Sequence, residues 1–224
     1  MEVIIVSKTH MSNAACIGAM TVNGRYIRLL NEGGFNQPLD TSFEVRQLWE
    51  IEFVERANRI APHIEDVIIR TKRLRGKMRS DYTMLQLVQR LNAPVWRGTP
   101  DVLFDGLLQW TNSGSGYISE NTHLPNNSVG FWIPSCDLTK RIFYDKVRYN
   151  FPNTDTWRSL PYVGFEEAVD RIPAGTLVRV SLARWWDTNG TTENRCSLQL
   201  SGWYDLPEDP DPLFDVDINA DFPF

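Results

Sequence analysis

Residues 176–204 constrain the fold more than any other stretch of this chain. They hold two runs in which apolar and polar residues alternate, joined by a polar turn that contains Asn189-Gly190. Asn-Gly supplies the positive φ angles of tight hairpins, and side chains along a strand alternate between its two faces. We therefore predict a β-hairpin with one buried face and one polar face. The buried face is expected to hold Val178, Val180, Leu182, Cys196, Leu198 and Leu200.

The polar face of this hairpin is the first candidate binding surface. It carries Arg179, Ser181, Ser197, Gln199 and Ser201, with Trp185 and Trp203 at the strand ends. A polar face edged by tryptophans suits contact with a flat, polar ligand. The alternative is a solvated outer face whose tryptophans fold back onto the core.

Composition bounds the class of protein. With 224 residues, 42% of them hydrophobic and 12% aromatic, the chain can bury a core as one large domain or two small ones. It has no apolar run of bilayer-spanning length, and its first residues lack the charged segment of a signal peptide. The three cysteines are odd in number and far apart, which favours a reducing, cytoplasmic setting.

The pattern of short strands and turns predicts a mainly β fold of two packed OB-like barrels with short helices. Helical spacing predicts one helix from Tyr82 to Leu91, with its cap near Ser80-Asp81, and a second over 165–171. The expected units are a first barrel over 1–112, a linker rich in Ser, Asn and Gly over 113–127, a second barrel over 128–204, and an acidic, proline-rich tail over 205–224.

Charge is distributed unevenly. Seven of the 28 acids lie in 205–224, which leaves 23 basic against 21 acidic residues in the rest of the chain. Six of the ten residues in 70–79 are basic. A basic groove with aromatic rings that stack on bases is typical of single-strand binding, whereas a solvated strand end is the alternative. The candidate nucleic-acid-binding residues are Lys8, Thr9, His10, Arg28, Arg70, Lys72, Arg73, Arg75, Lys77, Arg79, Trp96, Arg179, Arg184, Trp185, Gln199 and Trp203.

Motifs for catalysis or metal binding are missing from the sequence. His10, His63 and His123 are isolated, and no CxxC, HExxH, P-loop or GxSxG spacing occurs. A Cys–His pair stays open as an alternative, because such partners meet only in space. We therefore expect no metal, no cofactor and no enzymatic activity.

Short segments at both ends of the body carry a family resemblance. Ser7-Lys8-Thr9-His10, Cys16-Ile17-Gly18 and 24–28, with SLARWW at 181–186 and CSLQLSGWY at 196–204, resemble the dual OB-fold domain family of prokaryotes and their mobile elements. The resemblance covers residues 1–204. It implies two packed OB-like barrels, occurrence in antiviral-defence neighbourhoods, and nucleic-acid or nucleotide binding.

The C-terminal tip carries a second resemblance. Asp221-Phe222-Pro223-Phe224 resembles the acidic tips of bacterial and phage single-stranded-DNA-binding proteins. In those families the tip recruits protein partners and competes with DNA for the OB groove. The resemblance thus implies partner contacts through Asp217, Asp221, Phe222 and Phe224.

Taken with the residues, these resemblances predict a cytoplasmic, non-enzymatic protein that binds single-stranded nucleic acid in prokaryotic or phage defence or replication. Its tail would serve autoinhibition or partner recruitment. The alternative is an adaptor or sensor that recognises a nucleotide or a protein on behalf of a partner effector.

Overall fold

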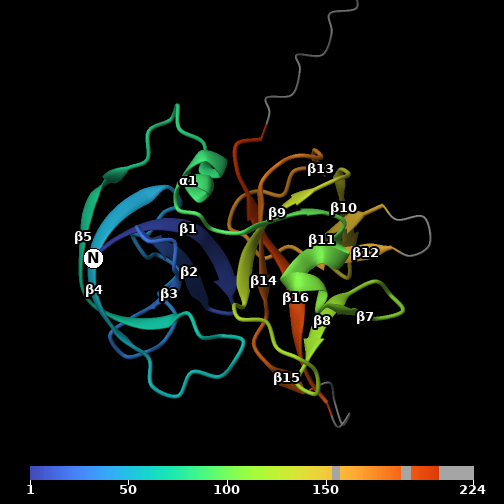
Figure 1. Cartoon of the computed structure of the whole chain (residues 1–224), viewed down its shortest axis with the longest axis horizontal. Coiled ribbons are helices and arrows are strands. Elements are labelled where there is room, and N and C mark those ends of the chain that lie inside the picture. Colours follow the sequence, from blue (N-terminus) through green and yellow to red (C-terminus); the bar gives the residue numbers. More distant parts are fainter. Residues whose placement is uncertain (153–156, 188–192, 207–224) are drawn as a thin grey trace, which may run out of the picture.

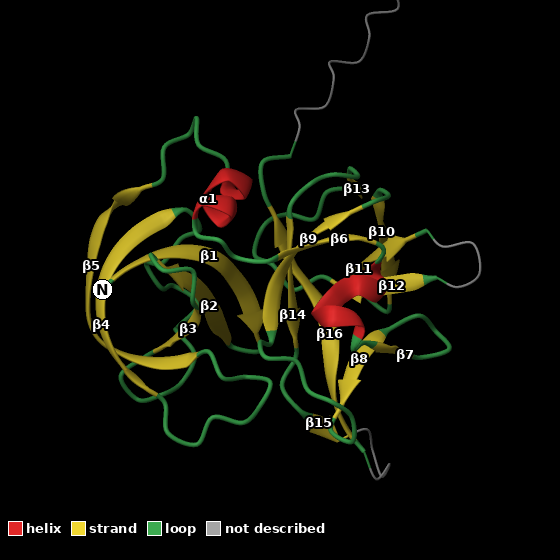
Figure 2. Cartoon of the chain, in the orientation of Figure 1, coloured by secondary structure: helices red, strands yellow, loops and turns green. Residues whose placement is uncertain are grey.

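The computed structural model describes residues 1–152, 157–187 and 193–206. Two β units lie side by side, and the one α-helix of the described chain sits between them (Figure 1). Strands dominate both units, as Figure 2 shows. The mainly β class that the sequence predicts is therefore confirmed. The predicted Asn189-Gly190 turn and the tail positions Asp217, Asp221, Phe222 and Phe224 lie outside the described residues.

The first unit is a closed five-stranded barrel in the order β1-β2-β3-β5-β4. Its strands are β1 (Glu2–Met11), β2 (Ala14–Thr21), β3 (Tyr26–Leu30), β4 (Gln47–Glu55) and β5 (Asp66–Lys77). Alternate residues of these strands, among them Ile5, Ile17, Leu29 and Ile51, fill the barrel interior with almost no exposed surface. Strand periodicity of two therefore builds this core directly.

The second unit combines two sheets that curl around one core. A seven-stranded sheet follows the order β6-β9-β14-β16-β8-β7, with β15 paired to β16, and a four-stranded sheet follows β12-β11-β10-β13. The strands are β6 (Val95–Gly98), β7 (Gln109–Trp110), β8 (Gly116–Ser119), β9 (Val129–Pro134), β10 (Leu138–Phe143), β11 (Lys146–Phe151), β12 (Arg158–Pro161), β13 (Arg171–Ile172), β14 (Val178–Leu182), β15 (Trp186–Asp187) and β16 (Asn194–Trp203). A kinked 3-10 segment, η1 (Pro100–Gly106), packs against this core.

The predicted hairpin forms as β14 and β16, which pair antiparallel with Val180 opposite Leu200. Its apolar face enters the core of the second unit as predicted. The first barrel covers part of its polar face, where Arg179 is only 1% exposed and Ser201 5% exposed, whereas Ser197 faces solvent. The alternating pattern thus identifies two faces correctly, and part of the second face packs against the other unit.

The helix α1 (Met84–Arg90) joins the two units. It begins two residues later than predicted, because Thr83 and Gln86 form a reciprocal capping box. Met84 and Val88 lie in a cluster with residues from both units, including Ile4 and Phe131. This cluster fixes the barrels to each other.

Two other expectations differ from the structure. The segment expected to be a second helix contains no helix: it bends at 165, 166 and 170, and its neighbour Gly164 forms a β-bridge with Thr9. The expected linker over 113–127 contains β8, which pairs with β16 inside the larger sheet. We therefore propose that the boundary between the units lies between α1 and β6.

Two general features complete the description. None of the helices in 1–152, 157–187 and 193–206 is long and apolar enough to cross a membrane. Cys16, Cys136 and Cys196 are free thiols.

Candidate nucleic-acid interface and the pocket between the barrels

The basic run lies on a strand edge that has no neighbour. β5 pairs with β3 only through residues 66–68, and beyond this point it pairs with β4 alone. All of residues 70–77 are exposed, on the side of the barrel away from the second unit (Figure 1). We call residues 70–77 the β5 edge. Positive charge on a free edge also blocks edge-to-edge aggregation, which is the structural role that this arrangement serves without any ligand.

Neighbouring acids compensate the charge of the β5 edge only in part. Arg73 lies 2.6 Å from a carboxylate oxygen of Glu50, and Arg75 lies 3.8 Å from the same oxygen. The hydrogen bond from Arg73 lowers the pKa of Glu50. Within the described ranges, no carboxylate pairs with Arg70 or Lys77. Exposed pairs of this kind are weak, so a phosphate can displace Glu50 at little cost.

The other two cations of the predicted run are also engaged at the surface. The Lys72 ammonium lies 4.6 Å from the ring centroid of Phe43 and 5.8 Å from that of Trp49, where it covers one end of the barrel core. Arg79 pairs with Asp81 at 2.6 Å. Both cations remain within reach of a ligand that lies along the edge.

A groove borders the β5 edge, and the loop that forms its other wall carries an exposed phenylalanine, Phe35. The volume of this groove is about 390 Å³, and the groove runs between Ile69–Lys72 and the loop that leaves β3. Asn31 Oδ1 holds this loop by accepting hydrogen bonds from the backbone N–H groups of Gly33 and Phe35, both at 3.0 Å. The Phe35 ring is 73% exposed. Sequence analysis missed Phe35, whose only signal is an aromatic residue in a glycine-rich loop.

The predicted stacking residues are mostly engaged within the protein. Trp203 is 7% exposed and packs 5.1 Å from the ring centroid of Tyr162, so it has no free face for a base, and the prediction for Trp203 is corrected. The Trp96 indole donates to Asp105 at 3.1 Å and rests against Gly130. The half-buried Trp185 donates from its indole N–H to the carbonyl of Ala61 at 2.9 Å, which ties the two units together.

Exposed aromatic side chains also occur at the tip of the β10–β11 hairpin, where Phe143 is 61% and Tyr144 83% exposed. Trp157, which directly precedes β12, is 60% exposed. Trp157 and Phe143 line a groove with Arg141 and Arg148. The sequence analysis did not single out these residues, because a turn aromatic looks the same in sequence whether it is exposed or buried.

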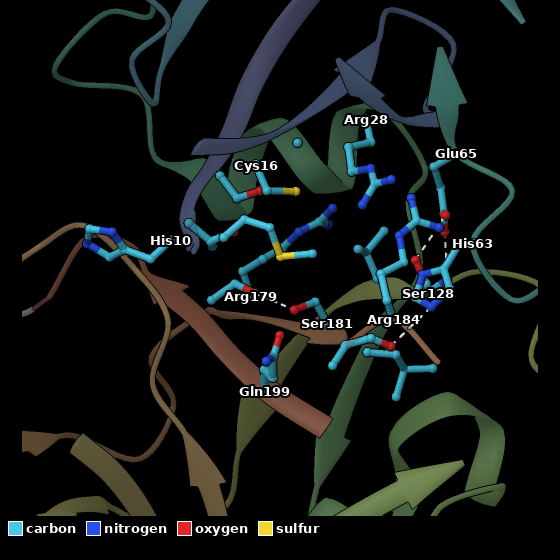
Figure 3. Close-up of a pocket in the computed structure, with 18 of the residues that line it drawn as sticks. His10, Cys16, Arg28, His63, Glu65, Ser128, Arg179, Ser181, Arg184 and Gln199 are labelled. Atoms are coloured by element: carbon cyan, nitrogen blue, oxygen red, sulfur yellow. Dashed lines mark hydrogen bonds between the residues drawn. The ribbon is translucent and has the colours of Figure 1, made fainter. Parts of the chain in front are cut away.

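A pocket between the two barrels, which we call the inter-barrel pocket, brings together six predicted residues (Figure 3). They are Thr9, His10, Arg28, Arg179, Arg184 and Gln199. Thr9, His10 and Arg28 come from the first barrel, and the other three come from the polar face of the hairpin and the segment after β14. Lys8 lies apart from them, paired with Glu44 at 2.6 Å in a neighbouring groove that Lys77 also lines.

One buried carboxylate binds two arginines of this pocket, Arg28 and Arg184, together with Arg56 outside it. The Asp66 side chain is 3% exposed and lies 2.7 Å from Arg28, 3.1 Å from Arg56 and 2.6 Å from Arg184. Arg28 belongs to the first barrel and Arg184 to the second unit, so Asp66 bridges them. Three guanidinium groups meet one carboxylate, which leaves this cluster positive.

A second buried acid, Glu65, is committed to the backbone and hydroxyl of Ser128. Its two carboxylate oxygens accept hydrogen bonds from the Ser128 N–H at 2.5 Å and the Ser128 hydroxyl at 2.9 Å. Burial raises the pKa of Glu65, against the opposing effect of these hydrogen bonds and the charge of Arg179. Neither acid's role could be predicted from sequence, since both lie at the end of an ordinary loop.

The Arg179 guanidinium occupies the deepest part of the interface. It lies 4.8 Å from the ring centroid of Tyr26 and 4.7 Å from that of Phe131, between one aromatic of each unit. Its Nε and Nη1 atoms are buried without a hydrogen-bond partner among the described residues. A buried cation with unused donors is unusual, because each unpaired donor loses its hydration without compensation.

A Cys–His contact, which the sequence left open, occurs between Cys196 and His63. His63 Nε2 lies 3.5 Å from the sulfur of Cys196 and 3.1 Å from the carbonyl oxygen of Ala183. Burial lowers the pKa of His63 to about 4 and raises that of Cys196 to about 12. At neutral pH the pair is therefore a neutral imidazole and a thiol, which lacks the thiolate of cysteine nucleophiles.

Metal ligands do not gather in the described part of the chain. Across 1–152, 157–187 and 193–206, no three His, Cys, Asp or Glu residues are placed to hold a metal ion together. The functional groups that the β5 edge and the inter-barrel pocket offer to a ligand are therefore their basic side chains and aromatic rings.

The family match agrees with the architecture of two β units. The dual OB-containing domain family matches residues 1–203. No curated protein matches the chain by sequence. Among solved structures, the Ifi202 HINa domain in complex with a 20 bp double-stranded DNA is 11% identical, covers 89% of each chain and has a TM-score of 0.35. A murine DNA-binding protein bound to double-stranded DNA is 8% identical, covers 93% of this chain and 98% of its own, and has a TM-score of 0.29.

Proposed function

Since the chain belongs to the dual OB-containing domain family over residues 1–203, we propose that it is a nucleic-acid-binding protein that holds a single strand along the β5 edge. The observation that carries this proposal is the exposed basic strand edge with a groove beside it. Its exposed cations suit successive phosphates, and Phe35 offers a ring to a base. Binding is the whole function proposed, with no catalytic step.

The single-stranded form of the proposal rests on the shape of this surface. A lone exposed ring beside a basic groove can stack on an unpaired base, which is worth ~1–3 kcal/mol per base. Stacked bases inside a duplex offer no free face to such a ring. The cellular setting that we propose, prokaryotic or phage defence or replication in the cytoplasm, rests on the sequence resemblances alone.

Fluorescence anisotropy tests this proposal directly. Labelled single-stranded DNA, single-stranded RNA and duplex DNA of equal length are titrated with the full chain at two salt concentrations. We expect one of the single strands to bind most tightly and its affinity to fall steeply with salt, because bound cations release counterions. Tighter binding to the duplex would refute the single-strand form, and no binding to any of the three would refute the proposal.

We also propose that the acidic tail, residues 205–224, regulates nucleic-acid binding by competing with the strand. Asp205, its first acid, pairs with Arg46 at 2.6 Å and accepts from the Met84 backbone N–H at 2.7 Å, which caps α1. A truncation should therefore keep Asp205 and Leu206 and remove residues 207–224. We expect the truncated chain to stay folded and to bind a single strand more tightly, most at low salt where charge competition is least screened. Unchanged affinity at low salt in a folded truncation would contradict autoinhibition.

One observation favours the alternative, recognition of a protein partner. Ile142, Phe143 and Tyr144 at the β10–β11 tip are 70%, 61% and 83% exposed, and contiguous exposed apolar side chains mark interaction sites. If the anisotropy titrations show no nucleic-acid binding, this tip becomes the site to test. Under the alternative, Tyr144→Asp should abolish partner capture without changing stability.

A further inference from the structure

We propose that the inter-barrel pocket is a binding site for a compact oxyanion, such as a phosphate monoester, with Arg179 as its principal ligand. This site is separate from the β5 edge. It would recognise a single anionic group and not the length of a strand.

The unused donors of Arg179 carry the proposal. The residue is 1% exposed, and its Nε and Nη1 atoms have no hydrogen-bond partner in the described part of the chain. Natural proteins seldom leave buried donors unpaired, so two such donors on one guanidinium point to a ligand that supplies acceptor oxygens. A guanidinium offers its donors in a planar fork that matches two oxygens of a phosphate or carboxylate.

The neighbouring acids are not available to Arg179. Asp66 is shared by Arg28, Arg56 and Arg184, and both oxygens of Glu65 accept from Ser128. The positive charge of Arg179 is therefore balanced through space by Glu65 and through its two ring contacts, but not by a direct ion pair. Together with the three arginines around Asp66, this makes the pocket electropositive.

The pocket has the size and lining for one such group. The space that the centre of a water molecule can occupy there is about 80 Å³. A single water needs roughly 10–15 Å³ by the same measure, so there is room for a small oxyanion or several waters. Hydroxyl and amide groups of Ser7, Ser181, Ser201 and Gln199 line the walls beside Arg179. These groups can donate to the remaining oxygens.

Gly18 keeps the space in front of Arg179 open. A Cβ atom at this position would lie 2.3 Å from the hydroxyl of Ser7 and 3.7 Å from Nη2 of Arg179. Any larger residue would therefore push the Ser7 side chain into the pocket. The backbone of β2 thus approaches the guanidinium closely, as a narrow anion site requires.

The test is the thermal stability of the full chain in sodium phosphate against sodium chloride at equal ionic strength. Above the dissociation constant, each tenfold rise in phosphate should raise Tm by roughly 3–5 °C, because ligand binding to the folded state adds a term logarithmic in concentration. Arg179→Met should abolish this rise, and Arg179→Lys, which keeps the charge without the fork, should shift its onset to about tenfold higher phosphate. The control Arg75→Met on the β5 edge should leave it unchanged.

Phosphorus NMR of the wild-type chain keeps the test decisive if the Arg179 variants do not fold. Saturable line broadening of inorganic phosphate at one site per chain supports the proposal, and its absence overturns it. Equal stabilisation of the wild type and Arg179→Met by phosphate would also overturn it.

Two further arms separate the sources of the oxyanion. Adenosine monophosphate tests a free nucleotide, and oligonucleotides with and without a 5′-phosphate test a strand end. A tighter complex with the 5′-phosphorylated strand that Arg179→Met reduces to the level of the unphosphorylated one assigns the site to strand ends. Displacement of phosphate by the nucleotide alone assigns it to nucleotides. Unphosphorylated strands should bind the wild type and Arg179→Met equally tightly. A result against the oxyanion site can therefore be told apart from a result against strand binding at the β5 edge.

Discussion

Replacing Asp66 by Asn should strongly destabilise the fold, because Asp66 is the only carboxylate within ion-pair distance of Arg28, Arg56 and Arg184 among the described residues. Asparagine has the same shape but no charge. It can accept from one or two of the donors, yet it cannot balance three cations. The variant therefore tests whether this cluster holds the barrels together by charge.

The expected magnitude follows from the exposure of the arginines. Removing one partner of a buried ion pair costs about 3–5 kcal/mol. The side chains of Arg28 and Arg184 are 16% and 32% exposed, and that of Arg56 is 43% exposed, so water screens part of the loss. We expect about 3 kcal/mol, the lower end of that range, which corresponds to a fall in Tm of roughly 6–12 °C for a chain of this size.

Urea and thermal unfolding of the two proteins measure this cost. Asp81→Asn is the matched control, since Asp81 pairs with Arg79 at 2.6 Å on the open surface, where both side chains are more than half exposed. Its cost should stay within about 0.5 kcal/mol. A loss of less than about 1 kcal/mol in Asp66→Asn would refute the reasoning, because it would show that the arginines do not need the carboxylate.

The remaining predictions concern a ring and a histidine. Phe35→Ala should weaken single-strand binding by ~1–3 kcal/mol without loss of stability, whereas Phe143→Ala, an exposed ring away from the β5 edge, should leave affinity unchanged; equal losses by anisotropy would contradict the placement of the strand. Because the pKa of His63 falls to about 4 in the folded state, the unfolded chain binds more protons between about pH 6.5 and 4. The fold should therefore lose up to about 3 kcal/mol from this group as the pH falls through that window, and His63→Gln should flatten the pH dependence of urea unfolding there; identical profiles would contradict the assignment.

The sequence predicts most of the local structure because strand periodicity is a local signal. The alternation in the hairpin identifies the six core residues of β14 and β16, and all six are buried together. Short strands are harder to see. β8 has four residues between glycine- and serine-rich segments, and its strand character depends on pairing with β16.

The candidate site is less accessible to sequence reasoning, because contacts across the chain assemble it. Arg184 meets Asp66 over a separation of 118 residues, and Cys196 meets His63 over 133 residues. A polar strand face also looks the same whether water or another barrel covers it. The sequence places Arg179 on that face, whereas its burial between Tyr26 and Phe131 follows only from how the two units pack.

The salt dependence of single-strand binding tests the central claim most directly. The triple variant Arg70→Ala, Arg73→Ala and Arg75→Ala removes three charges from the β5 edge, and the matched control Arg90→Ala, Arg97→Ala and Lys146→Ala removes three exposed charges elsewhere. If the strand follows the β5 edge, the slope of log affinity against log salt should fall by about 0.7 for each lost phosphate contact, or roughly 2 in all, in the first variant only. An unchanged slope in the first variant, or an equal fall in both, would contradict binding at the β5 edge.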